Sequence, residues 1–310
     1  MIKKKFISML LACVMISSSA TSVCAAQDSN SDTSQTQYPL TITDDLGTEV
    51  TIEKEPEKIV SLSPANTETL FALGAGDKVV GRTDYCNYPE EASDIASIGS
   101  YSEPNTELII SMEPDIVFAS DYIDDSIRSQ VEAAGAKVVV FSANSIDSVE
   151  QDIFTAGEIL NLNDKACEVT DTMKNELSKL QSDLSSIEDK KTAFIDLGSF
   201  YSAGPGSLLD DVLKNISVEN ITEESGEMWP QLSVEKIIEK DPDVYISLYT
   251  TPEELKKTTG ISDLECIKND SIIYYDGLSP QADMIQRAGP RIVEGARLLA
   301  QAIYPDIITE

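Results

Sequence analysis

The chain has 310 residues and a formal net charge of −31, with 54 acidic and 23 basic residues and no histidine. So negative a chain is a poor partner for nucleic acid. The lack of histidine excludes Ser-His-Asp and Cys-His mechanisms and removes the commonest transition-metal ligand.

The N-terminus has the pattern of an export signal. Residues 3–5 are lysines, residues 6–16 form an apolar run, and residues 17–26 are small and polar. We expect a signal peptide over residues 1–26, cut near its C-terminal alanines. The apolar run is too short to span a bilayer as a helix. The mature protein is therefore expected to work outside the cytoplasm, free or attached to the cell surface.

Two cysteines in this region are candidates for lipidation. Leu10-Leu-Ala-Cys13 resembles a lipobox, and Cys24 is a second, poorer candidate. Simple cleavage without lipidation stays open. Residues 27–37 are Ser, Thr, Asp and Gln without apolar anchors, which is typical of a flexible tether.

The next part of the chain alternates strand and helix patterns. Residues 38–52 alternate apolar and polar positions around Asp44-Asp-Leu-Gly47, which predicts a β-hairpin. Strands are predicted at residues 59–62, 116–119 and 137–141, with helical patterns between them. The first helix follows Ser63 and stops at Gly74. Strands that alternate with helices indicate parallel β-α units.

A long helix is predicted over residues 164–187. Its apolar residues step by threes and fours without Gly or Pro. At 1.5 Å per residue it would run about 36 Å. Because it lies between two sets of β-α units, it can join two lobes.

The α/β pattern then restarts. Strands are predicted at 192–197, 244–248 and 272–275, and helices at 208–213, 233–240 and 289–304. The expected fold is α/β, with two Rossmann-like lobes that each have a central parallel sheet. The lobes are expected at 38–163 and 189–310, with the linking helix at 164–188.

An internal repeat supports two related lobes. Glu107 precedes Pro114-Asp115 by seven residues, and Glu235 precedes Pro242-Asp243 by the same spacing. In both copies Pro-Asp leads into an apolar strand. The helix dipole favours a glutamate in the first turn, and the proline ends the helix.

Three cysteines follow the signal: Cys86, Cys167 and Cys266. They are far apart and show no Cys-x-x-Cys spacing, so no zinc site is predicted. One disulfide plus a free thiol, or no disulfide, both stay open. We expect neither a resident metal nor a cofactor.

These patterns in order resemble a known family. Ser63-Pro-Ala-Asn-Thr-Glu68, Tyr85–Pro89, Trp229-Pro-Gln231 and Arg287-Ala-Gly-Pro-Arg291 resemble the periplasmic substrate-binding proteins of ABC importers for siderophores, haem and cobalamin. The resemblance is nearest to the cobalamin-binding members. It implies a non-enzymatic protein that takes a corrinoid non-covalently between its lobes and delivers it to a membrane permease.

The resemblance also implies residue roles. The surface glutamates that pair with permease arginines correspond to Glu107 and Glu235. The positions that hold the ligand correspond to Tyr85, Trp229, Asp283 and Arg287, with Tyr101 where the cobalamin-binding members have a tryptophan. Tyr122 stands near a further missing tryptophan, Leu197 replaces an aromatic residue, and the disulfide of the second lobe is expected to be absent.

The residues themselves leave alternatives beside these roles. Trp229 could be a loop plug of the core or a platform for a flat ring. The i, i+4 pair Asp283 and Arg287 could fix an amide rim or form a weak surface ion pair. Tyr85 and Tyr88 lie on a predicted loop, where binding residues often occur.

Other ligands and another class of protein also stay open. A ferric siderophore usually requires a basic site, and this chain has five arginines. Haem would need a tyrosine ligand such as Tyr85, Tyr88 or Tyr101. In an enzyme, Ser63 would be the nucleophile, yet no base is at hand to activate it. We expect a monomer that binds a corrinoid.

Overall fold

The structure is a computed structural model that describes residues 35–308. These residues belong to one compact unit. The predicted signal peptide (1–26), the candidate lipidation sites Cys13 and Cys24, and most of the predicted tether (27–37) lie outside the described residues. Within the described range, no helix is both long enough and apolar enough to cross a membrane.

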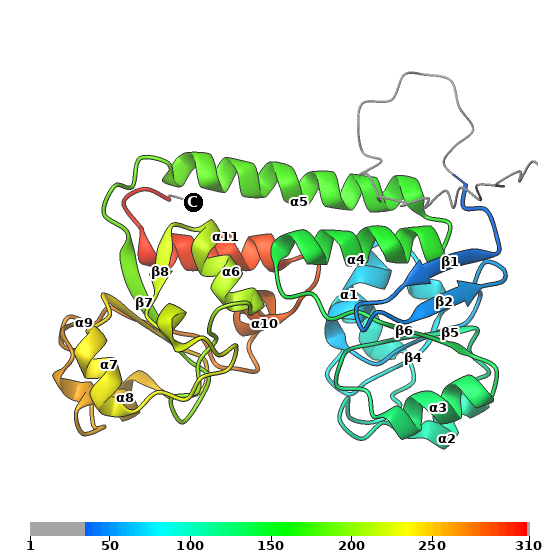
Figure 1. The fold of residues 1–310 in the computed structure, drawn as a ribbon, viewed down its shortest axis with the longest axis horizontal. Coiled ribbons are helices and arrows are strands. Elements are labelled where there is room, and N and C mark those ends of the chain that lie inside the picture. The colour runs from blue at the N-terminus through cyan, green and yellow to red at the C-terminus, as the bar shows by residue number, and fades with distance from the viewer. Residues whose placement is uncertain (1–34, 309–310) are drawn as a thin grey trace, which may run out of the picture. The chain divides into compact units, whose positions relative to one another are not determined.

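Two four-stranded parallel sheets organise the described chain (Figure 1). The first has the order β4-β3-β5-β6, and the second has the order β10-β9-β7-β8. Counted along the chain within each sheet, both orders are 2-1-3-4. The strands are β3 (Ile59–Ser61), β4 (Val79–Arg82), β5 (Ile116–Ala119), β6 (Lys137–Val140), β7 (Lys191–Asp196), β8 (Val218–Asn220), β9 (Val244–Ser247) and β10 (Ile272–Tyr274). We call the parts built on these sheets the N-lobe and the C-lobe.

Helices follow the strands in both lobes. The N-lobe has α1 (Pro64–Ala72), α2 (Thr106–Ser111), α3 (Asp125–Ala133) and α4 (Ile146–Ile159). The C-lobe has α6 (Leu208–Asn215), α7 (Val234–Lys240), α8 (Pro252–Leu255), α9 (Glu265–Lys268), α10 (Pro280–Gln286) and α11 (Ile292–Ile303). The predicted linking helix is α5 (Asn163–Leu184), which packs against α4 and α11.

The predicted hairpin is confirmed as β1 (Leu40–Thr43) paired antiparallel with β2 (Glu49–Ile52). Its turn is closed by Asp44, whose carboxylate accepts hydrogen bonds from the backbone N–H groups of Leu46 and Thr48. The hairpin contacts β6 through a bond from the Asp45 N–H to the Val140 carbonyl (3.1 Å).

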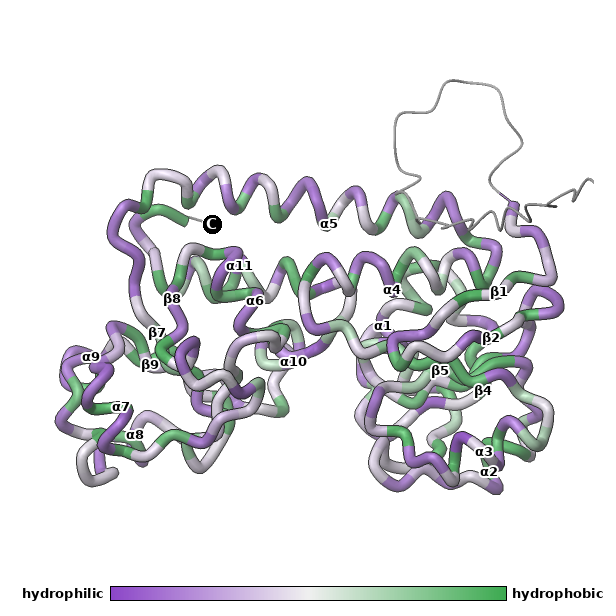
Figure 2. Tube along the Cα trace, viewed as in Figure 1, coloured by the Kyte–Doolittle hydropathy of each residue, from purple (hydrophilic) through white to green (hydrophobic). Residues whose placement is uncertain are grey.

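Strand residues alternate between two cores, as the two-residue period of a strand requires. In β3, Ile59 joins a core that runs through both lobes under α4, α5 and α11, while Val60 joins a core under α2 and α3. In β7, Ala193 belongs to the shared core, and Phe194 belongs to a core under α7 and α9. Figure 2 shows β4 and β5 of the N-lobe as mainly apolar segments. One continuous core thus connects the lobes.

The internal repeat has a structural counterpart. The Asp115 carboxylate accepts hydrogen bonds from the N–H groups of Glu57 and Lys58, just before β3 (2.9 and 3.0 Å). The Asp243 carboxylate likewise accepts from the N–H of Thr192 in β7 (2.8 Å). Each aspartate therefore fastens the third strand of its sheet to the first.

The sequence predictions missed the short strands β4 and β8. The last helix begins at Ile292 rather than at residue 289. Residues 289–291 form a turn instead, in which the Ile292 N–H donates to the Gly289 carbonyl (3.1 Å).

Candidate functional site

The strand order places a binding region at one edge of each sheet. In a 2-1-3-4 sheet the connections leave strands 1 and 3 in opposite directions, and ligands bind beyond the carboxyl ends of those two strands. These strands are β3 and β5 in the N-lobe, and β7 and β9 in the C-lobe. The segments beyond the carboxyl ends are therefore where functional side chains are expected.

Three exposed tyrosines lie in segments that follow strands of the N-lobe sheet at this carboxyl edge. Tyr85 follows β4, Tyr101 lies in the next loop, and Tyr122 follows β5. The Tyr85 and Tyr101 rings meet edge-to-face with centroids 5.7 Å apart, and Tyr101 meets Tyr122 at 6.3 Å. Edge-to-face contacts of this kind fix rings relative to one another. All three rings are at least 44% exposed, so they are available to a ligand.

The C-lobe presents three further exposed aromatic side chains: Tyr201, Trp229 and Tyr249. The backbone of residues 202–204 donates to the carbonyls of Pro230 and Met228, so the loops that carry Tyr201 and Trp229 run side by side. They approach closely at Gly204, where a Cβ atom would come 2.1 Å from the Glu227 carbonyl oxygen. Two effects raise the pKa of Tyr249: burial, which is the larger, and the electrostatic influence of Tyr101 in the N-lobe. Tyr249 is therefore within electrostatic reach of Tyr101.

We call Tyr85, Tyr101, Tyr122, Tyr201, Trp229 and Tyr249 the aromatic face. These are six of the seven exposed aromatic side chains in the described part of the chain.

The buried carboxylate of Asp196 holds together two C-lobe loops that carry residues of the aromatic face. Asp196, at the carboxyl end of β7, is fully buried and accepts hydrogen bonds from the N–H groups of Gly198 and Phe200. It also accepts from the hydroxyls of Tyr245 (2.9 Å) and Thr250 (3.3 Å). Two effects raise the pKa of Tyr245: burial, which is the larger, and the negative charge of Asp196. Asp196 thus ties the loop before Tyr201 to the loop after Tyr249.

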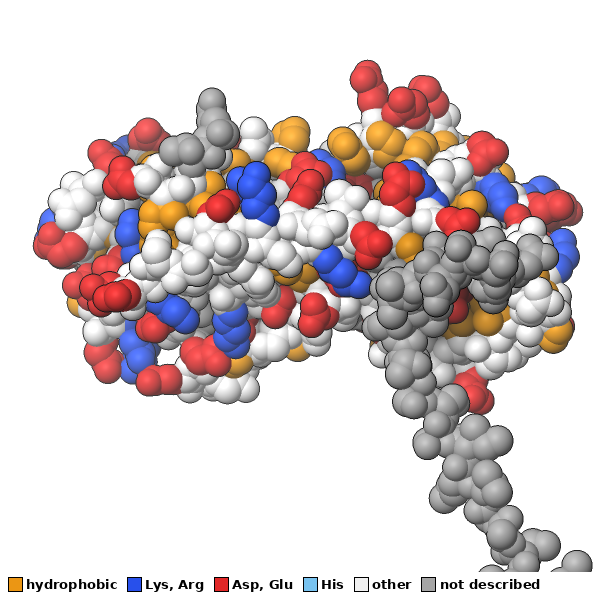
Figure 3. All heavy atoms as spheres, turned by 90° about the horizontal axis from the view of Figure 1, so that it is seen from above, with side chains coloured by type: hydrophobic (Ala, Val, Ile, Leu, Met, Phe, Trp, Pro, Cys, Tyr) orange, Lys and Arg blue, Asp and Glu red, His pale blue; other side chains and the backbone are white. Residues whose placement is uncertain are grey.

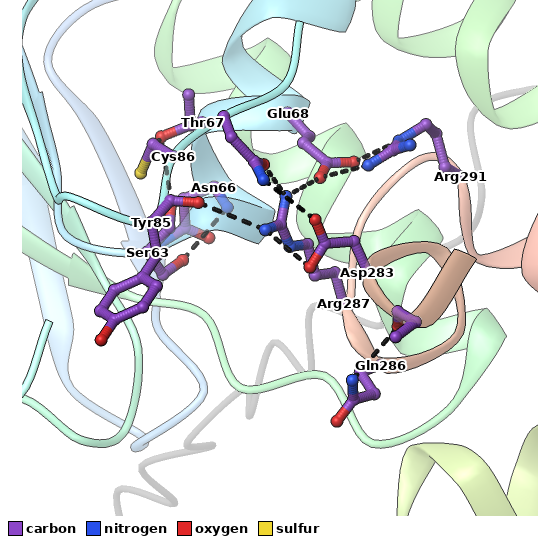
Figure 4. A network of polar contacts seen from close by, with 12 residues as sticks. Ser63, Asn66, Thr67, Glu68, Tyr85, Cys86, Asp283, Gln286, Arg287 and Arg291 are labelled. Atoms are coloured by element: carbon purple, nitrogen blue, oxygen red, sulfur yellow. Dashed lines mark hydrogen bonds and ion pairs between the residues drawn. The ribbon is translucent and has the colours of Figure 1, made fainter. Parts of the chain in front are cut away.

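Beside the aromatic face, Arg287 lies at the centre of a polar cluster (Figure 4). It follows α10 and pairs with Asp283 one turn earlier (2.9 Å). It also pairs with Glu68 of α1 (2.7 Å). The Glu68 side chain is 3% exposed, and those of Arg287 and Asp283 are each 13% exposed. The interpretation of Asp283 and Arg287 as a weak surface ion pair is therefore wrong.

A second arginine completes the cluster. Arg291 donates to both oxygens of Glu68 (2.8 Å each), and its guanidinium lies 3.6 Å from the centroid of the Tyr88 ring. Burial works against the charged guanidinium, but the hydrogen bonds to Glu68 outweigh it and raise the pKa of Arg291. Arg291 therefore stays charged.

The structure separates the alternatives for several other residues. Trp229 is 52% exposed, so it does not plug the core. Leu197 packs on the edge of the shared core, and the exposed aromatic of this loop is Tyr201. Sequence reasoning missed Tyr201 and Tyr249. Their position just beyond β7 and β9 is the signal that could have identified them.

The contacts and burial of Ser63, Cys86 and Cys266 give these residues structural roles. The Ser63 hydroxyl caps α1 by accepting from the Asn66 N–H (3.1 Å), which is a helix-capping role. Cys86 and Cys266 are buried free thiols, and Cys86 contacts the hydroxyls of Thr67 and Thr83. Within residues 35–308, no three His, Cys, Asp or Glu side chains gather closely enough to hold a metal ion.

A cavity of about 770 Å³ lies between α1, α5 and the start of α11, next to the polar cluster, and Glu68, Tyr88 and Arg291 are among the residues that line it. It is lined by apolar residues such as Phe71 and Met173 and by several acidic residues. None of Tyr85, Tyr101, Trp229, Asp283 and Arg287 lines it. The aromatic face is thus separate from this cavity.

The two glutamates of the repeat occupy matching places. Glu107 lies in the first turn of α2, and Glu235 lies in the first turn of α7. Both side chains are exposed. The hydrogen bond with its own backbone lowers the pKa of Glu235 most, and a hydrogen bond with the Ser233 side chain lowers it further. Each lobe thus presents one glutamate at an equivalent helix start.

Comparison with known proteins places the chain among ligand carriers. The profile of the family described as "Periplasmic binding protein" matches residues 59–277. The chain is 32% identical to the uncharacterized ABC transporter substrate-binding lipoprotein YvrC of Bacillus subtilis (strain 168), over 98% of this chain and 97% of that protein. It is 29% identical to the vitamin B12-binding protein of Salmonella choleraesuis (strain SC-B67), over 79% of this chain and 90% of the other.

A solved structure has the same fold. The periplasmic haem-binding protein RhuT from Roseiflexus sp. RS-1, in its apo form, aligns with a TM-score of 0.73 at 24% identity. The alignment covers 82% of this chain and 99% of that one. The two-lobed α/β architecture is therefore shared with proteins whose names give different ligands.

Proposed function

Because the chain belongs to the periplasmic binding protein family, we propose that it captures cobalamin or a related corrinoid and delivers it to the permease of an ABC importer. Its general class is a substrate-binding protein of an ABC transporter, located outside the cytoplasm. Members of this class carry ligands and do not catalyse reactions. The proposal concerns the identity of the ligand and the residues that hold it.

The observation that carries the proposal is the aromatic face. A corrin is a large flat ring with an amide-bearing rim, and aromatic side chains can cover the two faces of such a ring. Here three tyrosines come from the N-lobe, and Tyr201, Trp229 and Tyr249 come from the C-lobe. A flat ligand between them would be covered from both sides.

Polar groups beside the face can bind the rim of the ring. Asn87, Asp283 and Gln286 form hydrogen bonds at the edge of the aromatic face, and the Tyr249 hydroxyl donates to Gln286 (3.2 Å). Amides and carboxylates complement the amide substituents of a corrin. The similarity to a vitamin B12-binding protein points to the same ligand class.

Charge disfavours an anionic ferric siderophore. Arg287 is paired with Glu68 and Asp283, so its positive charge is already balanced. A trianionic or otherwise acidic chelate would find little free positive charge at this face. The siderophore alternative is therefore ranked below the corrinoid.

Haem is the second candidate because exposed phenols are present. Tyr85 and Tyr101 are exposed, and a tyrosine can ligate haem iron in a chain without histidine. Tyr88 is a weaker candidate, since Arg291 stacks on its ring.

The partner in the membrane is proposed to meet both lobes. Glu107 and Glu235 are exposed carboxylates on rigid helices, one per lobe, and can pair with arginines on two permease subunits. We propose that the protein docks through these two glutamates as a monomer.

A titration with three ligands tests the ligand assignment. Purified mature protein is mixed in turn with cyanocobalamin, haemin and a ferric hydroxamate, and binding is followed by calorimetry and visible absorption. We expect heat and co-elution with cyanocobalamin, and no shift of its absorption that would indicate loss of the lower base. A haem spectrum typical of phenolate ligation, with no response to cyanocobalamin, would favour haem and contradict the corrinoid.

A further inference from the structure

The terminal nitrogens of Arg287 are fully engaged by the protein. Nη1 donates to the Glu68 carboxylate (2.7 Å) and to Asn87 Oδ1 (2.8 Å). Nη2 donates to the Tyr85 carbonyl (3.2 Å) and pairs with Asp283 (2.9 Å). A ligand could bind either nitrogen only by displacing one of these partners.

These contacts cross from one lobe to the other. Glu68, Tyr85 and Asn87 belong to the N-lobe, while Asp283 and Arg287 belong to the C-lobe. Asn87 also donates to Asp283 (3.1 Å), which closes a ring of hydrogen bonds between the lobes. Figure 4 shows Glu68 of α1 converging with Asp283 and Arg287 of the α10 region.

The cluster is balanced in charge and poorly exposed. Glu68 and Asp283 supply two negative charges, and Arg287 and Arg291 supply two positive charges. All four side chains are at most 13% exposed. Removing one member of a buried charge cluster leaves another buried charge without a partner, which is strongly unfavourable. A single substitution in the cluster is therefore expected to disturb the contact between the lobes.

The cluster also holds the loop that carries Tyr85. Arg287 binds the Tyr85 carbonyl, while the Tyr85 ring points away from the arginine (Figure 4). Three residues further on, the Tyr88 ring stacks on Arg291. Two arginines of the C-lobe thus fix both ends of residues 85–88 in the N-lobe.

We propose that Glu68, Arg287, Arg291 and Asp283 form an inter-lobe clasp that sets the angle between the lobes and positions Tyr85. In this arrangement Glu68 and Arg287 are positioning residues, and neither contributes its charge to the ligand. The effect on the ligand rests on the proposed function, whereas the effect on the lobe angle does not.

The clasp is tested first without ligand. Fluorophores on non-canonical residues that replace Ala133 of α3 and Glu253 of α8 report the distance between the lobes. We expect Glu68→Gln to broaden the distance distribution and to speed amide exchange at residues 85–89. Glu150→Gln is the matched control, because Glu150 is also a buried acid with a basic partner, but that partner, Lys174, lies on the adjacent helix α5. An unchanged distance distribution in Glu68→Gln would overturn the clasp.

A second variant covers the case in which Glu68→Gln does not fold. Asn87→Ala removes hydrogen bonds to Arg287 and Asp283 without leaving a buried charge unpaired, and we expect a smaller broadening of the same distribution. A distribution equal to that of wild type would overturn the clasp here too.

Ligand binding then separates the clasp from the ligand assignment. If wild type binds cyanocobalamin, Glu68→Gln should weaken binding by about tenfold or more, equivalent to roughly 1.4 kcal/mol. If wild type does not bind it while Glu68→Gln still broadens the distances, the clasp stands and the ligand assignment fails. If the variant binds as tightly as wild type, Glu68 does not position the site.

Discussion

Trp229 is held on the aromatic face by the backbone around it. Residues 202–204 hydrogen-bond to the carbonyls of Pro230 and Met228, on either side of the tryptophan. The close approach at Gly204 leaves no room for a side chain there. The indole is exposed while its backbone is fixed, so little conformational entropy is lost when a ligand covers the ring.

We expect Trp229→Ala to weaken corrinoid binding by about 1–3 kcal/mol, the scale of one buried aromatic contact. Calorimetry with cyanocobalamin measures the change. Leu46→Ala, at the exposed tip of the hairpin, controls for loss of an exposed apolar side chain and should bind like wild type. An unchanged affinity in Trp229→Ala would remove this residue from the site.

Between elements, a pair of aspartates joins the hairpin to α4. Asp152 of α4 is 7% exposed and lies beside Asp45 of the β1–β2 turn. Asp45 also accepts a hydrogen bond from the Ser142 N–H (2.6 Å), which follows β6. Burial, followed by the charge of Asp45 and a hydrogen bond to it, raises the pKa of Asp152 to about 8. In the folded state Asp152 therefore keeps a proton that an unfolded chain releases near pH 4.

This pair makes stability depend on pH in a defined direction. Because the folded state binds more protons than the unfolded state between about pH 4 and pH 8, the free energy of unfolding should fall as pH rises through that window. The contribution of one group is at most about 1.4 kcal/mol per pH unit. Asp152→Asn keeps a hydrogen-bond donor toward Asp45 but cannot ionise.

We expect the free energy of unfolding to fall less in Asp152→Asn than in wild type as the pH rises from 5 to 8. Urea unfolding at several pH values measures the difference. Asp147→Asn, at the exposed start of the same helix, controls for removal of one negative charge. Parallel stability profiles of wild type and Asp152→Asn would show that Asp152 does not keep its proton.

At the scale of elements, the sequence predicted what is long or strongly patterned. The hairpin and α5 were found because their apolar residues repeat with clear periods, and β5 and β9 were found because each is an apolar run directly after a Pro-Asp pair. The strands β4 and β8 were missed because neither is an apolar run: β4 ends in Gly-Arg, and β8 has Val218 as its one apolar residue. The 2-1-3-4 order was also inaccessible, since strand order depends on pairing between segments far apart in the chain.

The site could be predicted only in part for a related reason. The resemblance supplied Tyr85, Tyr101 and Trp229, and all three are exposed beyond the carboxyl ends of strands. It also supplied Arg287, but not the Glu68 partner, because the two are 219 residues apart. Pairing between buried charges across lobes depends on the tertiary structure, which no local pattern encodes.

At the scale of the whole molecule, acidic residues greatly outnumber basic ones. On the face shown in Figure 3, the acidic side chains are scattered and interspersed with basic ones. A net charge of −31 spread in this way favours solubility and disfavours non-specific binding to anionic surfaces. Specific docking therefore has to come from particular carboxylates at defined positions.

Glu107 and Glu235 meet that requirement because the two lobes repeat one design. Both start the helix before the third strand of their sheet, and both helices lead into a Pro-Asp pair that fastens this strand. The clasp and the shared core would hold the two glutamates at a fixed separation. Two fixed carboxylates can engage two equivalent arginine clusters of a symmetric permease.

The double variant Glu107→Ala with Glu235→Ala should keep the fold and the ligand affinity but weaken permease binding and uptake. Charge reversal of both residues to lysine should be more harmful, because it sets like charges against each other across the interface. Transport at limiting binding-protein concentration measures the effect, and the exposed pair Glu91→Ala with Glu253→Ala, one acid per lobe, is the control. If the double variant and the control transport equally well, the glutamates only complement their helix dipoles, a contribution of about 0.3–1 kcal/mol each.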